Sequence, residues 1–253
     1  MPIDLSVSVS TAFHPTAHQH LPKPDTIMLS SDAVLFFVHS TTILIACDSA
    51  FQSFLGSPLD DPIWRNTLIT LDAPSAELNV LLHMLYGKSC AVHSPPFGTL
   101  SNAIDRMLAY SIPPATHILP STSLYNVLLS YAPLHPLDLY ALAAHHNLHS
   151  LAVSTSSHLL SYSLPTITDD QAERMGSVYL RKLVLLQLDR FLAMKNILLK
   201  LPHPHAPTKL CGFTEQKRLS RVWALASASW VWDAKLGESY LSGLPCDFCS
   251  SRL

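Results

Sequence analysis

Strand-like patterns in this chain are confined to its first third, and this order constrains the fold more than any other feature. Residues 25–39, DTIMLSSDAVLFFVH, have the pattern of two short strands with Ser-Asp-Ala as the turn between them. NTLITLDA at 66–73 is a third candidate strand, and from residue 75 onward apolar side chains recur mainly at helical spacing. Because strands and helices do not alternate, we predict an α+β fold rather than repeating βαβ units.

Proline, glycine and acidic residues mark the ends of the predicted helices. A helix from about residue 40 to 55 should bury Ile43, Leu44, Cys47 and Phe51 on one face. A second helix, 75–87, should end at a glycine, and others should begin at the proline of PLDLYALAAHHNL and near the acidic pair of ITDDQAERM. A long helix is expected at 178–199, and a last one, EQKRLSRVWALASASWVWDAKL, carries three of the four tryptophans and should bury Trp223 and Trp230.

The chain should contain four segments. Residues 1–24 are rich in Ser, Thr, His and Pro and are expected to be a disordered lead-in. Residues 25–118 should form an α+β domain, 119–200 a mainly helical extension, and 201–253 a C-terminal tail with the Trp-rich helix and a CxxC motif.

Composition narrows the classes of function. The net charge is −2 and the 16 Lys and Arg are scattered, which argues against a nucleic-acid-binding surface. The most apolar zone, 178–199, is interrupted by charged residues, and the start of the chain does not have the pattern of a secretory signal, so we expect no membrane span. Five scattered cysteines favour a reducing intracellular compartment, either cytoplasm or nucleus.

Residues 36–51, FFVHSTTILIACDSAF, bring together residue types that catalysis uses. A hydrolase needs a nucleophile, a base and oxyanion donors that converge, and this stretch has no G-x-S-x-G elbow. We interpret His39 as a strand–helix corner, Ser40 or Thr41 as a helix cap, and Cys47 as a small core residue. We therefore expect no catalytic activity.

The cysteines near the C-terminus offer an alternative function. Cys246 and Cys249 have the spacing of two zinc ligands, and Cys211 with His203 or His205 could complete the site. The protein would then be a zinc-clipped regulatory protein, with nucleic-acid association open to it. We expect no other cofactor. His145 and His146 are adjacent, so on a helix they would point about 100° apart and would not easily share a metal.

The start of the predicted domain resembles a BTB/POZ domain. The similarity is carried by Asp25, Leu29, Ser31-Asp32, Phe36-Phe37 and His39, then by Leu44, Ser49 and Phe51. Ile69-x-Leu71-Asp72 and LLHMLYG at 81–87 continue it, and PLDLYALAAHHNLHSLA at 136–152 is similar to the version of the family abundant in mushroom-forming fungi. The resemblance implies a short three-stranded sheet with helices, followed by a mainly helical extension.

For function, the resemblance implies a protein–protein interaction module. Members commonly dimerise through the first helix, and many are adaptors for cullin-type scaffolds in ubiquitin ligases. This chain has Ser40 where dimeric relatives usually carry a basic residue and Ala33 in place of the usual turn glycine, which leaves homodimerisation open. The interaction candidates are Trp64, as an aromatic anchor, and the neighbouring Asp60 and Asp61.

Overall fold

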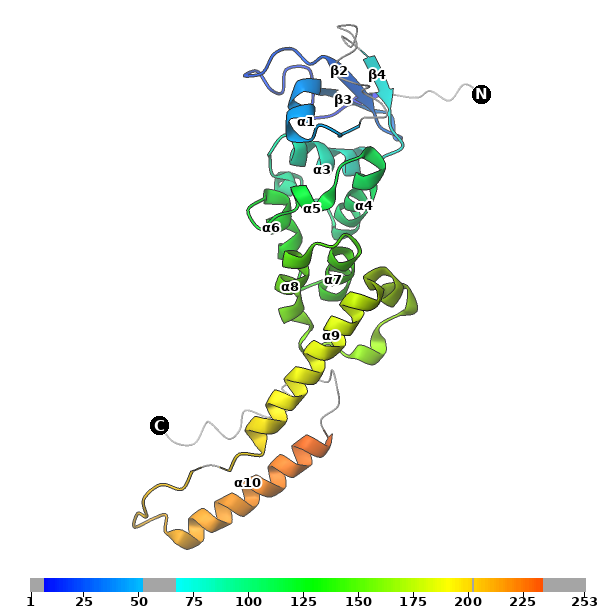
Figure 1. Cartoon of the computed structure of the whole chain (residues 1–253). Helices are drawn as coiled ribbons and strands as arrows, with labels where there is room; N and C mark the ends of the chain where they lie inside the picture. Colours follow the sequence, from blue (N-terminus) through cyan, green and yellow to red (C-terminus); the bar gives the residue numbers. More distant parts are fainter. Residues whose placement is uncertain (1–6, 52–66, 202, 234–253) are drawn as a thin grey trace. The chain divides into compact units, whose positions relative to one another are not determined.

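The computed structural model describes residues 7–51, 67–201 and 203–233 (Figure 1). The chain divides into two compact units, Met1–Thr155 and Ser156–Leu253. The first unit contains a small sheet and several helices, and the described part of the second is helical, so the predicted α+β fold is confirmed. The boundary lies near residue 155, whereas the sequence led us to expect boundaries after residues 118 and 200. In the described part of the chain, no helix combines the length and apolar composition that a membrane span requires.

The sheet has the strand order β1-β3-β2-β4, formed by Ser8–Val9, Val34–Val38, Thr26–Leu29 and Thr67–Thr70. Strands β2 and β3 form the predicted antiparallel hairpin, while β4 pairs parallel to β2 and β1 pairs parallel to β3. The turn of the hairpin holds Ala33 at φ 60°, a left-handed conformation that glycine adopts without strain. Ala33 thus has a backbone conformation that a glycine would adopt more easily.

One face of the sheet supplies the core of the first unit. Met28 stands opposite Phe36 on β3 and Ile69 on β4, and all three side chains are buried. Because side chains alternate across a strand, Ile27 and Phe37 turn to the other face and are only half-buried. Helix α3 (Ser75–Leu85) contributes several fully buried leucines, and its buried Glu77 accepts a hydrogen bond from Arg106 on α4 at 2.5 Å.

The helices of the first unit begin and end near the residues that the sequence marks. Helix α3 gives way to Gly87 at φ 63°, and α7 (Pro136–His145) begins at its proline. Helix α1 (Ser40–Ala46) is shorter than predicted, because Cys47 is already extended. The remaining elements of this unit are η2 (Cys90–His93), α4 (Phe97–Met107), η3 (Leu108–Tyr110), α5 (Pro114–His117), α6 (Ser123–Ser130) and α8 (His149–Ser156), whose last residue falls in the second unit.

The N-terminal segment 7–22 is packed, which differs from the disordered lead-in that we expected. Phe13 is 1% exposed, and its ring lies 5.1 Å from that of His83 and 5.2 Å from that of Tyr86, both edge-on. The Phe13 carbonyl accepts a hydrogen bond from the amide of Phe37 on β3. Buried Phe13 and a two-residue strand thus help to hold a segment with little apolar periodicity.

The second unit contains η4 (Ser157–Leu159), η5 (Leu164–Thr166), α9 (Asp169–Leu198) and α10 (Phe213–Asp233). Thr168 and Gln171 form a capping box at the start of α9, and Gly176 interrupts the helix at φ 70°. The indole of Trp223 donates to the carbonyls of Leu198 and Lys200, so it satisfies backbone acceptors at the end of α9. Trp230 is 49% exposed, so its predicted burial is wrong.

Candidate interaction surface

The first helix is fixed to the sheet by a carboxylate. Asp25, just before β2, accepts hydrogen bonds from the Ser40 amide at 2.8 Å and from the Ser40 hydroxyl at 2.6 Å. Both oxygens of Asp25 are therefore bound at the first residue of α1, where the helix dipole also favours a negative charge. Ser40 is uncharged, and it binds Asp25 by hydrogen bonds instead of by charge.

His39 completes this corner of the molecule. Its Nε2 donates to the Pro22 carbonyl at 2.8 Å, and its Nδ1 accepts from the Tyr86 hydroxyl at 2.9 Å. The backbone amide of His39 donates to the same hydroxyl at 2.7 Å. Burial raises the pKa of Tyr86 to about 12, so the hydroxyl keeps the proton that it donates. The imidazole thus links the N-terminal segment, the end of β3 and the end of α3.

A second carboxylate fixes α3 in the same way. Asp32, in the hairpin turn, accepts from the Ser75 amide at 2.8 Å and from the Ser75 hydroxyl at 2.6 Å. The Ser30 hydroxyl also donates to Asp32, at 2.6 Å. Burial acts to raise the pKa of Asp32, but the hydrogen bonds from Ser30 and Ser75 outweigh it and lower the pKa.

The other residues of the resembling pattern lie in α1 and in the segment after it. Phe51 is fully buried beside Tyr110, and Leu44 is half-buried. The Ser49 hydroxyl donates to the Ser111 carbonyl at 2.7 Å and lies 3.4 Å from Cys47 Sγ. The hydroxyl of Ser49 therefore ties the segment after α1 to the turn after η3.

The outward side of α1 exposes one large apolar side chain. We call Thr41 and Ile45 the α1 face, since they lie one turn apart and both are exposed. Ile45 is 87% exposed, although isoleucine is among the residues most often buried. The corner formed by Asp25, Ser40 and His39 fixes the helix that carries this side chain.

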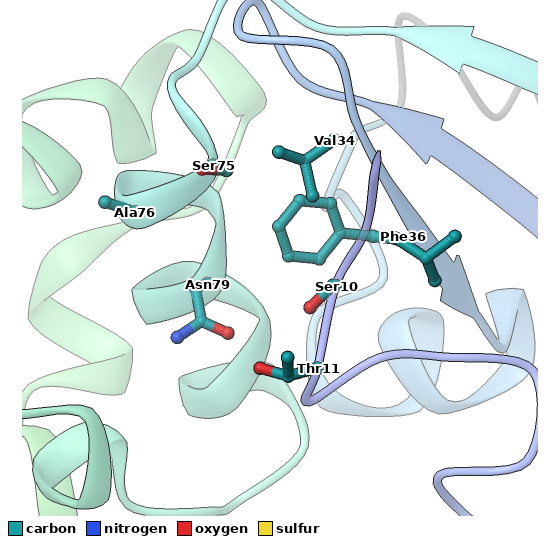
Figure 2. A pocket seen from close by; sticks show the side chains of 8 residues that line it. Ser10, Thr11, Val34, Phe36, Ser75, Ala76 and Asn79 are labelled. Carbon is teal, nitrogen blue, oxygen red and sulfur yellow. The ribbon is translucent and has the colours of Figure 1, made fainter. Parts of the chain in front are cut away.

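A shallow groove of about 240 Å³ lies elsewhere on the unit (Figure 2). Phe36 and Val34 of β3 lie between the N-terminal segment and the first turns of α3 in this view. The other lining residues are Val9, Ser10, Thr11, Ser75, Ala76 and Asn79. Its volume falls below the roughly 300–1,000 Å³ of sites that hold a drug-sized ligand or cofactor.

The structure also brings together residues that sequence reasoning kept apart. His145 ends α7 and His146 follows it, outside the regular helix, with its Nε2 2.7 Å from Asp105 Oδ1 on α4. The two imidazole rings lie 4.8 Å apart. The angle of about 100° holds only within a regular helix, so the two imidazoles can lie close together at this helix end.

Several predicted site residues lie outside the described part of the chain: Asp60, Asp61, Trp64, Cys246 and Cys249. Cys211 is described and partly exposed in the loop before α10. Among the described residues it belongs to no group of three metal-binding side chains.

Comparisons with protein-family models, with curated proteins and with solved structures found no match.

Proposed function

We propose that the first unit contains an interaction module of BTB/POZ type, centred on residues 25–118. It binds another protein through surface complementarity, without catalysis, and acts as an adaptor in ubiquitin ligase or regulatory complexes. A cullin-type scaffold is the partner that this proposal names.

The observation that carries the proposal is the hydrogen-bonded corner at the start of α1. Asp25 and His39, two of the residues that carry the resemblance, bind the same strand–helix junction. Tyr86, from the Leu-Tyr-Gly stretch, binds His39 through its hydroxyl. Three separate segments of the sequence thus meet through residues that carry the resemblance, and this supports an architecture like that of BTB/POZ domains. Three of the four strands, the hairpin β2–β3 with β4 parallel to β2, also accord with the short three-stranded sheet of the family, and β1 adds a fourth strand beside β3.

The α1 face supports a protein partner. Ile45 is a large apolar side chain that is 87% exposed, and covering it with a partner would remove apolar surface from water, which is favourable. The first helix is also where members of the family commonly dimerise.

Two measurements with purified protein test the proposal. Pull-down with a purified cullin scaffold should retain the chain, and size-exclusion chromatography with light scattering should show whether it also forms a dimer. If the α1 face is the contact surface, Ile45→Asp should weaken binding or dimerisation at least tenfold. Val92→Asp is the matched control, since Val92 is 86% exposed and lies on η2 instead of α1. A monomer that no cullin scaffold retains would contradict the adaptor function.

A further inference from the structure

Asp105, His145 and His146 form a group with the donor atoms of a metal site. One ligand atom from each residue lies within 4.8 Å of the other two. Asp105 comes from α4, and the two histidines come from the end of α7, 40 positions along the chain. The group therefore depends on the folded first unit and does not exist in a local stretch of sequence.

The burial of the three side chains differs in a way that suits a bound ion. The side chain of His146 is only 2% exposed, and its Nε2 lies 2.7 Å from Oδ1 of Asp105. His145 and Asp105 reach solvent. One ligand is thus held in place by packing, while the other two can turn by the small amount needed to reach bonds of about 2 Å. An ion entering here would replace the proton between His146 Nε2 and Asp105 Oδ1.

The position at the end of α7 adds a further attraction for a cation. The last carbonyls of a helix carry a partial negative charge, and α7 ends at His145. Two imidazoles and one carboxylate suit zinc and similar divalent ions, whereas magnesium and calcium prefer oxygen ligands throughout.

We propose that Asp105, His145 and His146 bind one divalent transition-metal ion of the zinc class. The three protein ligands leave a coordination position open to water or to a side chain of another protein. The proposed ligands include neither a residue of the α1 face nor a cysteine, and the site does not depend on the proposed adaptor function.

Zinc titration of the chelator-stripped full chain by calorimetry tests the site. His145→Ala removes an exposed ligand and leaves the His146–Asp105 pair in place, so it should fold normally and bind zinc roughly tenfold more weakly or worse. Asp105→Asn should weaken binding to a similar extent. His149→Ala, a change of another exposed histidine just beyond α7, should leave the affinity unchanged.

Cobalt(II) absorption separates this site from one made by cysteines. Ion bound by imidazole and carboxylate gives visible bands without the near-ultraviolet charge transfer of cobalt–thiolate bonds. A variant with Cys211→Ser, Cys246→Ser and Cys249→Ser should keep the visible bands. Equal zinc affinity in the His145→Ala and His149→Ala proteins would overturn the proposal, as would failure of the natural chain to bind zinc or loss of the bands in the cysteine variant.

Discussion

Acidification should destabilise the first unit, and His18 should account for much of the loss. His18 lies buried in the N-terminal segment, and its Nε2 accepts a hydrogen bond from Lys88 Nζ at 3.2 Å. Burial, with the charge of Lys88 next in importance, lowers the pKa of His18 from 6.5 to about 4. His39 and His20 also face it and act in the same direction. The buried ring thus favours the neutral form that the fold requires.

The sign follows from proton linkage. Because the pKa of His18 is lower in the folded chain than in the unfolded chain, the unfolded chain takes up the proton first as the pH falls. The stability that neutral His18 contributes is complete above pH 6.5 and is lost as the pH falls toward 4. At pH 5 these two pKa values correspond to a loss of about 2 kcal/mol.

Urea unfolding followed by circular dichroism at pH 7.5, 6 and 5 measures this loss. His18→Gln keeps an acceptor for Lys88 but cannot be protonated, so it should lose about 2 kcal/mol less than the natural chain over this range. A remaining slope is expected from His83, because burial lowers its pKa as well. The exposed control His149→Gln should follow the natural chain. Parallel pH profiles for the natural chain and His18→Gln would refute the reasoning, as would an NMR titration of His18 near pH 6.5.

Two substitutions test the backbone and the core. Ala33→Gly should stabilise the first unit by roughly 0.5–1 kcal/mol, because glycine relieves the left-handed strain at φ 60°. Asn147→Gly, at φ 56°, should gain less stability, since asparagine tolerates this region. A lower urea midpoint for Ala33→Gly than for the natural chain would count against strain at Ala33. Phe13→Ala should cost about 3–5 kcal/mol by leaving a cavity beside Tyr86, whereas Val9→Ala at an exposed position should cost about 0.5 kcal/mol or less. Equal urea midpoints for these two variants would show that the N-terminal segment is not part of the cooperative fold.

Local chemistry made much of the fold predictable from the sequence. Pro136 and Gly87 restrict or free the backbone dihedral angles at their own positions. They therefore mark the start of α7 and the end of α3 independently of tertiary contacts. The hairpin β2–β3 was readable for the same reason, since its turn and its strands are neighbours in the sequence.

Features that depend on distant contacts were not predictable. Phe13 is one aromatic in a polar segment, and its burial comes from His83 and Tyr86, about 70 positions away. The group of Asp105 with His146 needs the approach of α4 and α7 and the break in helical geometry after His145. One feature of the sequence could have marked Asp105 as a candidate ligand. It is an acidic residue near the end of a helix whose other face is apolar.

The two aspartate–serine contacts flank the same strand. Asp25 stands immediately before β2 and binds the start of α1, while Asp32 stands three residues after β2 and binds the start of α3. A slip of β2 by one residue would displace both carboxylates together and leave the first turn of each helix without its acceptor. A mispaired hairpin would thus lose hydrogen bonds at two helices at once. The register of this short strand therefore determines whether both helices receive their acceptor.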